Sequence, residues 1–371
     1  MKDKQRKAPA VIMTAVFLIF VFGFAAAFLV TGDREFSETE NRSLAQKPEF
    51  SWEAVKSGKF TSGLESYISD QLFAKDRLVT LKTDIDRALG KSFLNRVFLI
   101  DEGGLRYIQQ YKENRTQIEQ NILCLKEFAE GVGIPADLML IPNASAFYLD
   151  KLPAGADCDD QRESIEYVRS LVGDSIGFYP MTAPLSEDPQ KYYYRTDHHW
   201  TYYGAKAAVE SYLGSSIGGE LRQAEEGFYG TLYSKAPSVF AKADDFIYAD
   251  SVQAEQVEWV NEGRISGSIL DESFLSRKDK YASFFGGNFG QIRIKTGCPG
   301  EKLLVLKDSY ANATMQFLMQ HYSEITMIDL RYYHMQEKSV SELCREYGVD
   351  RVLMLYNMDF INEDRNFVWL E

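Results

Sequence analysis

Two histidines stand side by side in the segment Arg195-Thr-Asp-His-His-Trp200, directly after an aspartate. An aspartate and a histidine two residues apart project to the same side of an extended chain. Asp197 can therefore accept a hydrogen bond from one imidazole nitrogen of His199 and leave the other nitrogen as a general base. His198 is expected to point elsewhere. The alternatives are a polar surface or core feature, or a metal site, for which the sequence offers no convincing third ligand.

A serine occupies the second position suited to chemistry. The apolar run Leu303–Leu306 leads into Asp308 and Ser309, and a helix is predicted over about 311–321. This places Ser309 at the carboxyl end of a parallel strand, where α/β folds build their sites. The adjacent helix start supplies N–H groups for an oxyanion. The alternative is that Asp308 or Ser309 only caps that helix.

Together the two segments supply a nucleophile (Ser309), a general base (His199) and an orienting acid (Asp197), as acyl transfer requires. Ser309 and His199 are expected within about 2.6–3.2 Å of each other in the fold, although 110 residues separate them in the sequence. The sequence has no phosphate-binding loop, dinucleotide fingerprint or G-x-S-x-G elbow. It predicts no cofactor and no metal.

The surrounding elements alternate between strands and helices, which predicts a mostly parallel sheet covered on both faces. Short apolar strands are predicted at 97–100, 138–141, 176–179, 303–306, 325–328 and 351–356. Helices are predicted around 118–129, 160–172, 311–321 and 337–347, and the pattern over 51–90 is helical as well. Residues 220–296, rich in glycine, serine and aromatics, are expected to form an irregular β-rich insertion.

The N-terminus has the pattern of a membrane anchor. Residues 1–9 are basic, and residues 10–30 carry no charge and are long enough to cross a bilayer as a helix. The basic flank is expected to stay in the cytoplasm and the rest of the chain outside, so that the protein is single-pass. Residues 31–50 are polar and are expected to form a stalk. A cleaved signal peptide is the alternative, although its apolar region would be unusually long.

Charge and cysteine content exclude other classes. The formal net charge of −13 makes nucleic-acid binding improbable. The four cysteines form no C-x-x-C pair and lie at no metal spacing from a histidine, so a structural zinc site is not expected. Outside the cytoplasm a disulfide is possible, but the sequence does not select a pairing.

Several segments resemble the bacterial DHHW protein family, which is similar to the alginate O-acetyltransferase proteins. Those relatives have an SGNH-hydrolase-like fold, a three-layer sandwich, and an Asp-x-His-Trp motif upstream of an Asp-Ser motif. The resemblance implies the same triad: Asp197, His199 and Ser309. The segments that carry it are Asp197–Trp200, Glu40–Arg42, Asp70–Arg77, Phe285–Asn288 and Lys307–Tyr310.

The resemblance also implies a motif order that is circularly permuted, since SGNH hydrolases normally begin with Asp-Ser and end with the Asp/His block. Residues 91–371 would form the catalytic domain. Asn357 resembles the SGNH oxyanion asparagine, and Asn288 competes for that role; Tyr310 and Arg331 are further candidates for contacts to the oxyanion or substrate. Where SGNH enzymes usually carry glycine before Asp-Ser, this chain has Lys307.

The function implied is an extracytoplasmic O-acyltransferase, specifically an O-acetyltransferase, that modifies a cell-surface polysaccharide or exopolysaccharide through an acyl-serine. Because acetyl-CoA is absent outside the cell, a polytopic membrane acyltransferase would supply the acyl group. The alternatives are a carbohydrate esterase or deacetylase with the same triad, and a non-catalytic polysaccharide-binding or assembly protein.

Overall fold

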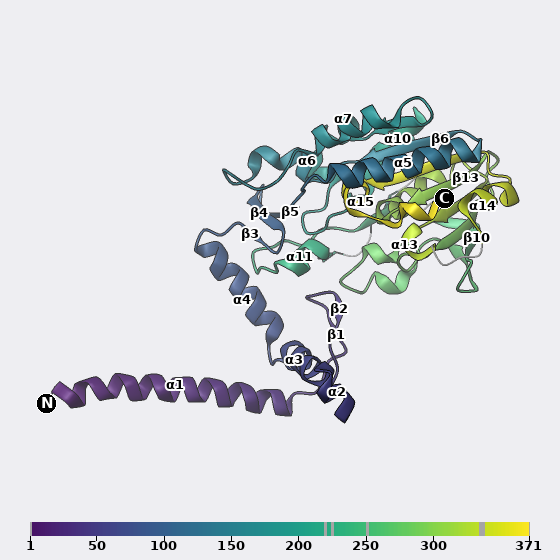
Figure 1. The fold of residues 1–371 in the computed structure, drawn as a ribbon. Coiled ribbons are helices and arrows are strands. Elements are labelled where there is room, and N and C mark those ends of the chain that lie inside the picture. The colour runs from purple at the N-terminus through teal and green to yellow at the C-terminus, as the bar shows by residue number, and fades with distance from the viewer. Residues whose placement is uncertain (1, 219–220, 224–225, 250–251, 334–337, 371) are drawn as a thin grey trace. The chain divides into compact units, whose positions relative to one another are not determined.

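The computed structural model describes residues 2–218, 221–223, 226–249, 252–333 and 338–370 (Figure 1). Met1 lies outside the described residues. The same is true of the first residue of the 220–296 segment and of the first residue of the helix predicted over 337–347. The chain divides into two compact units. One holds residues 1–90 with 236–239, and the other holds 91–235 with 240–371.

The larger unit is built on an eight-stranded sheet with the order β11-β10-β12-β14-β13-β15-β6-β7. Its five adjacent strands from β14 to β7 run parallel. Their bounds are β14 (Glu324–Ile328), β13 (Lys302–Lys307), β15 (Arg351–Asn357), β6 (Ala136–Ile141) and β7 (Gly177–Pro180). The structure confirms the mostly parallel sheet that the strand and helix alternation predicts.

The other three strands come from the segment expected to be an irregular insertion. They are β10 (Gln253–Trp259), β11 (Arg264–Ser268) and β12 (Gln291–Lys295). All three pair antiparallel, and β12 pairs with β14. Part of 220–296 therefore extends the main sheet. Val257, Trp259, Ile292 and Ile294 are buried in the same core as the parallel strands, and this burial explains why these strands join the sheet.

Alternate residues of the parallel strands face two separate cores, as expected for strands buried on both sides. Helices α5 (Arg115–Val132), α7 (Gln161–Val172), α14 (Val340–Tyr347) and α15 (Met358–Glu363) cover one face. Helix α10 (Tyr202–Leu213) and the segment of η4 (Ser309–Thr314) and α12 (Met315–Leu318) cover the other face. The first core holds Leu138, Leu140, Leu304, Leu306, Val352 and Met354, and the second holds Met139, Ile141, Leu303, Val305, Leu353 and Leu355. The result is a three-layer α/β/α sandwich.

Shorter elements complete this unit. Strands β3 (Phe93–Leu94), β4 (Val97–Asp101) and β5 (Leu105–Gln109) form a small antiparallel sheet, and β8 (Leu221–Gln223) pairs with β9 (Ile247–Ala249). The short helices are α6 (Ser145–Tyr148), α8 (Thr182–Leu185), α9 (Pro189–Tyr192), α11 (Thr231–Lys235) and α13 (Leu330–Tyr333), with 3-10 turns η1 (Leu149–Lys151), η2 (Glu272–Phe274), η3 (Tyr281–Ser283) and η5 (Asn366–Leu370). The thiols of Cys158, Cys298 and Cys344 are free.

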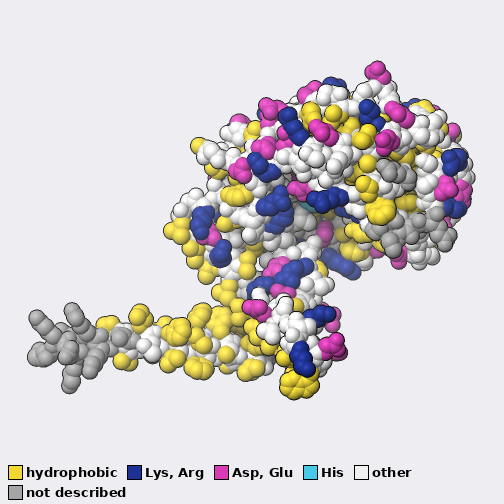
Figure 2. Space-filling view, in the orientation of Figure 1, with side chains coloured by type: hydrophobic (Ala, Val, Ile, Leu, Met, Phe, Trp, Pro, Cys, Tyr) yellow, Lys and Arg dark blue, Asp and Glu magenta, His cyan; other side chains and the backbone are white. Residues whose placement is uncertain are grey.

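The smaller unit begins with the apolar helix α1 (Lys2–Val30). Among the described residues, its segment Val11–Val30 is the one helical stretch long and apolar enough to cross a membrane. Its hydrophobic side chains are exposed along the helix (Figure 2). A helix of this kind near the N-terminus is compatible with a membrane anchor and with a signal sequence.

The rest of the smaller unit is tied together by ion pairs. Helices α2 (Trp52–Lys56), α3 (Lys59–Gln71) and α4 (Lys75–Ala88) divide the predicted helical segment, and β1 (Phe36–Ser37) and β2 (Arg42–Ser43) form a hairpin within 31–50. Arg42 donates to both carboxylate oxygens of Asp70 at 2.7 and 2.6 Å. Lys75 lies 2.7 Å from Glu40 and 3.0 Å from Asp70. These four residues, which belong to segments that carry the family resemblance, hold the hairpin against α3.

Candidate active site

Ser309 lies at the carboxyl end of the central strand β13. Asp308 follows the strand, and its Oδ1 accepts a hydrogen bond from the N–H of Tyr310 at 2.8 Å, so Asp308 caps the helical turn η4 that begins at Ser309. The Asp308 Oδ2 atom accepts from the N–H and the side-chain amide of Asn357 at 2.7 and 2.6 Å. Asp308, and not Ser309, is therefore the residue that caps the turn, so capping does not use the Ser309 hydroxyl. The same Asp308 carboxylate joins the ends of β13 and β15.

The Asp-His-His segment reaches Ser309 from a different part of the chain. His199 Nε2 lies 2.8 Å from Ser309 Oγ, within the hydrogen-bond reach expected from the sequence. His199 Nδ1 lies 2.6 Å from Asp197 Oδ1. Because a carboxylate only accepts, Nδ1 carries the proton and Nε2 presents its lone pair to the serine. The three side chains thus form one continuous hydrogen-bonded chain.

Asp197 is held in place by further donors. Its Oδ1 also accepts from the N–H of His199 at 2.9 Å, and its Oδ2 accepts from the N–H of Thr231 at 2.7 Å. Burial by itself raises the pKa of Asp197. The two neighbouring imidazoles and these donors lower the pKa by more than burial raises it, so it lies well below the usual range. The carboxyl is therefore ionised at neutral pH and can stabilise an imidazolium on His199.

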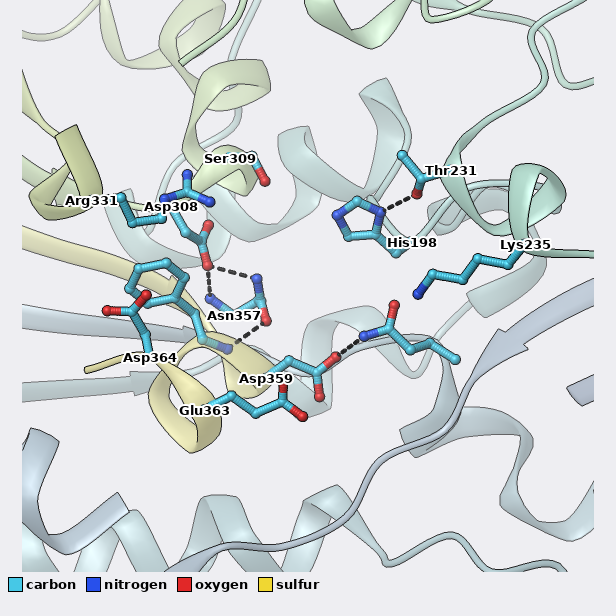
Figure 3. Close-up of a pocket in the computed structure, with 12 residues that line it drawn as sticks. His198, Thr231, Lys235, Asp308, Ser309, Arg331, Asn357, Asp359, Glu363 and Asp364 are labelled. Carbon is cyan, nitrogen blue, oxygen red and sulfur yellow. Dashed lines mark hydrogen bonds between the residues drawn. The ribbon is translucent and has the colours of Figure 1, made fainter. Parts of the chain in front are cut away.

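His198, which was expected to point elsewhere, takes no part in the hydrogen-bonded chain from Asp197 to Ser309, but its Nδ1 lies 3.6 Å from Asp197 Oδ1. Its Nδ1 lies 2.7 Å from Thr231 Oγ1, and its ring lines the pocket beside the serine (Figure 3). Burial lowers the pKa of His198 to about 3, so this imidazole is neutral at pH 7.

A pocket of about 510 Å³ opens beside Ser309. The neighbouring strands β14, β13, β15 and β6 all end near it, which is the usual place for a site in an open α/β sheet. Its lining is mostly polar (Figure 3): Gln109, His198, Thr231, Lys235, Asp308, Ser309, Arg331, Asn357, Asp359, Phe360, Glu363 and Asp364.

A sequence profile described as "DHHW protein" matches residues 133–328, more than half of the chain. The chain belongs to the DHHW protein family. This confirms the resemblance seen in the sequence. The matched range includes Asp197, His198 and His199, and it extends to Ser309 on the other side of the site.

Solved structures share the fold. A DHHW family protein from Eubacterium siraeum is 23% identical with a TM-score of 0.61, over 74% of this chain and 95% of that one. Bacillus cereus PatB1 with a sulfonyl adduct is 19% identical with a TM-score of 0.61, over 74% and 99% of the two chains. The O-acetyltransferase domain of Pseudomonas putida AlgJ is 13% identical with a TM-score of 0.45, over 72% and 93%. A comparison with curated protein sequences gave no match.

Two of the four candidates for oxyanion or substrate contacts in this DHHW protein line the pocket. Asn357 does so with its amide beside Asp308, and Arg331 does so while paired through Nε and Nη2 with Asp329 at 2.9 and 2.6 Å. Tyr310 is buried outside the lining, and its N–H is occupied by Asp308. The first N–H groups of a helical turn have no acceptor within it, so the N–H of Ser309 is a third possible donor.

Asn288 also lies outside the pocket lining. Its Oδ1 accepts from Lys307 Nζ at 3.0 Å and from the Asn312 amide at 3.1 Å. Lys307, the residue that departs from the SGNH pattern, is buried and lies 3.4 Å from Asp329, and burial lowers the pKa of its amine. Asp329 thus joins Lys307 to Arg331, and Asn288 belongs to the buried polar cluster behind the pocket.

Two residues that no sequence pattern marks contact this hydrogen-bonded chain. Thr231 donates its N–H to Asp197, and the Tyr281 ring stacks on His199 with centroids 3.8 Å apart and planes 9° apart. The Tyr281 hydroxyl donates to the carbonyl of Ser309 at 3.0 Å, so one side chain contacts both His199 and the turn that begins at Ser309. No local motif marks either residue, because each meets the triad only through tertiary packing.

Asp197, His198 and His199 also offer three possible metal-ligand atoms within 4.8 Å of one another. In the structure, the Asp197 carboxylate and His199 Nδ1 are hydrogen-bonded to each other, and His198 Nδ1 is bonded to Thr231. A metal ion would have to replace these bonds. In the hydrogen-bonded arrangement the lone pair of His199 Nε2 faces the Ser309 hydroxyl.

Proposed function

We propose that this DHHW protein is a Ser-His-Asp O-acetyltransferase that modifies a polysaccharide outside the cytoplasm. The observation that carries the proposal is the unbroken hydrogen-bond chain from Asp197 through His199 to Ser309 at the edge of an open polar pocket. A nucleophile, a base and an orienting acid in this geometry are the requirements of acyl transfer through a covalent intermediate.

The reaction would proceed in two balanced steps. Ser309 Oγ attacks the carbonyl carbon of an acyl donor while its proton passes to His199 Nε2. The bond between the carbonyl carbon and the donor's leaving group then breaks, and the leaving group takes that proton. In the second step a sugar hydroxyl gives its proton to His199 Nε2 and attacks the carbonyl carbon of the acyl-serine. The bond between that carbon and Ser309 Oγ then breaks, Oγ takes the proton from His199, and the acetylated sugar leaves.

Charge on the tetrahedral intermediate would be stabilised beside Ser309. The Ser309 N–H, the Asn357 amide and the Arg331 guanidinium are the donors at this edge of the pocket. Arg331 retains Nη1 for this purpose, because its bonds to Asp329 use Nε and Nη2.

Relatives support the choice of acyl transfer. PatB1, which shares the fold, has been captured with a sulfonyl adduct, and sulfonyl reagents typically react with activated nucleophiles. The resemblance of the DHHW family to the alginate O-acetyltransferase proteins favours acetyl as the acyl group and a polysaccharide as the acceptor. The exposed apolar helix α1 supports a membrane anchor with the larger unit outside, where a polytopic membrane acyltransferase would supply the acyl group.

The proposal is tested by treating purified protein with phenylmethanesulfonyl fluoride or p-nitrophenyl acetate and locating the modification by mass spectrometry. We expect one group per chain on Ser309, and its loss in Ser309→Ala. Ser283→Ala is the matched control, because Ser283 is buried and its hydroxyl has no hydrogen-bond partner among the described residues. Modification of Ser309→Ala to the wild-type extent would exclude the acyl-serine.

An esterase is the second candidate, favoured by the polar lining of the pocket, which admits water to an acyl-serine. The two functions differ in the group that accepts the acyl chain. Acetylated oligosaccharide formed from p-nitrophenyl acetate and a sugar acceptor identifies a transferase. Release of acetate at a rate that no acceptor changes identifies an esterase.

A further inference from the structure

Two charged side chains in the pocket have no role in the acyl-transfer steps. Lys235 is the last residue of α11, and Asp359 lies in the first turn of α15. In Figure 3 the Lys235 side chain extends from α11 toward the side of the pocket where Asp359 lies. Both residues line the pocket together with Ser309. Lys235 and Asp359 are therefore placed to contact an acceptor sugar close to the hydroxyl that would react with the acyl-serine.

Two side-chain amides hold the Asp359 carboxylate in place. Its Oδ2 accepts from the side-chain amides of Gln109 and Asn143, each at 2.5 Å. Among the described residues, no hydrogen bond reaches its Oδ1. Side chains fixed by such supporting bonds are typical of groups that position a ligand. Asp359 thus lines the pocket and retains one carboxylate oxygen that has no hydrogen-bond partner among the described residues.

Lys235 is the complementary donor. Its ammonium makes no hydrogen bond or ion pair with any residue in the described part of the chain. Burial lowers the pKa of Lys235, and Asp359, Glu363 and Asp197 act in the opposite direction. The Lys235 side chain is exposed, so its ammonium is open to solvent and to a ligand in the pocket.

We propose that Asp359 and Lys235 form a saccharide subsite that binds two neighbouring hydroxyls of a neutral acceptor sugar. A sugar hydroxyl both donates and accepts, so one hydroxyl can donate to Asp359 Oδ1 while its neighbour accepts from Lys235 Nζ. A few convergent polar groups of this kind fix the orientation of a ligand in a pocket. The subsite would hold a third hydroxyl of the same chain near His199 and Ser309.

The charges of the pocket exclude acidic sugars from this subsite. Glu363 and Asp364 add two carboxyls to Asp359 on this side, and Arg331 is already paired with Asp329. A uronate carboxylate or a phosphate bound there would pair with Lys235, but it would be repelled by these carboxyls and would leave Asp359 Oδ1 without a donor. The acceptor class is therefore a neutral polysaccharide.

This inference rests on the proposed transferase function, so the test measures the two acyl-transfer steps separately. Donor acylation is followed as the p-nitrophenol burst from p-nitrophenyl acetate. Acceptor use is followed as acetylation of cellopentaose, xylopentaose and chitopentaose, with trigalacturonate as the acidic comparison. Absence of a burst in the wild-type protein would refute the proposed function itself.

Asp359→Asn is the decisive variant. The asparagine oxygen can still accept from Gln109 and Asn143, while its amide replaces the free acceptor with a donor. We expect an unchanged burst and a KM for the neutral acceptor raised about 10- to 100-fold, as for the loss of a charged hydrogen bond. Lys235→Met should act similarly. Glu166→Gln is the control, because it removes a carboxylate from helix α7 outside the pocket lining, where Glu166 is paired with Arg169 at 2.9 Å.

Three results would overturn the subsite: trigalacturonate acetylated as well as the neutral sugars, no neutral sugar acetylated despite a normal burst, or a KM in both Asp359→Asn and Lys235→Met within twofold of wild type. Circular dichroism and thermal unfolding establish that each variant is folded. A purely structural role for Asp359 would lower the burst and acceptor use together, whereas the subsite predicts that only the acceptor KM changes.

Discussion

The Asp197→Asn substitution tests whether the buried carboxylate sets the proton position on His199. Oδ1 of Asp197 receives the His199 N–H and Nδ1, and Oδ2 receives the Thr231 N–H. Donors thus surround both oxygens, and an amide has only one oxygen. If its NH₂ group faces His199, Nδ1 must accept, and the proton moves to Nε2, where it blocks proton transfer from Ser309.

The opposite orientation of the amide is also unfavourable. Its NH₂ group would then face the Thr231 N–H, which lies 2.7 Å from Oδ2. A buried donor left without an acceptor costs about 1–3 kcal/mol. Loss of the correct tautomer in such a triad lowers kcat about 10⁴-fold, which corresponds to about 5.4 kcal/mol at about 1.36 kcal/mol per factor of ten. The expected effect on turnover is therefore much larger than the effect on the free energy of unfolding.

Hydrolysis of p-nitrophenyl acetate measures the turnover, and urea unfolding measures the stability. Asp244→Asn is a matched control, because Asp244 accepts from the N–H groups of Arg195 and Thr196 at 2.8 and 2.9 Å but bonds to no imidazole among the described residues. It should lose comparable stability and keep turnover within about tenfold of wild type. A folded Asp197→Asn protein with at least a tenth of wild-type turnover would refute the proposed role of Asp197.

Three further results are expected. His199→Ala should lower the turnover of aryl acetate by at least about 10³-fold. His198→Ala removes a neutral ring bonded to the Thr231 hydroxyl and should lower the same turnover by less than about tenfold. The reverse order would contradict the assignment of His199 as the base. Burial, reinforced by a nearby carboxylate, raises the pKa of Asp359 to about 7, so this carboxyl is ionised above that pH. The KM for the acceptor should therefore fall as the pH rises through about 7 in the wild-type protein, but not in Asp359→Asn. Lys307→Met should lower the free energy of unfolding by about 1–3 kcal/mol in urea titrations, because it removes the buried donor to Asn288 and Asn312 while Asp329 keeps its pair with Arg331. A change below about 0.5 kcal/mol would show that these bonds of Lys307 are unimportant for stability.

The strands were predictable because their signal is local. Each parallel strand is a short run of apolar residues, and burial on both sheet faces demands such a run whatever its neighbours are. The helix predicted over 311–321 was less accurate, since the structure has η4 followed by the four-residue α12. Thr314 donates to the carbonyl of Ala311, and Gln316 donates to the carbonyl of Ala313. Side chains that bond to the backbone in this way compete with a regular helix.

The segment 220–296, which was expected to be an irregular β-rich insertion, shows where prediction of β structure from the sequence fails. The strands β10, β11 and β12 have fewer consecutive apolar residues than the parallel strands, and their place in the main sheet depends on pairing with β14. That pairing joins residues far apart in the sequence. An edge position cannot be recognised from a strand's own residues, because side-chain packing with the neighbouring strand decides it.

For the site, the sequence by itself determined the residue types and the internal geometry of the Asp197-His199 pair, since two residues of extended chain fix that relation. It also placed Ser309 at a strand end. Only the tertiary structure decided that the two segments meet, with Ser309 Oγ 2.8 Å from His199 Nε2. It also decided that Thr231 supports the triad and that Lys235 and Asp359 share its pocket. The reason is physical: spacing along a chain fixes only nearby side chains, whereas contacts across 110 residues follow from strand order and the packing of the two cores.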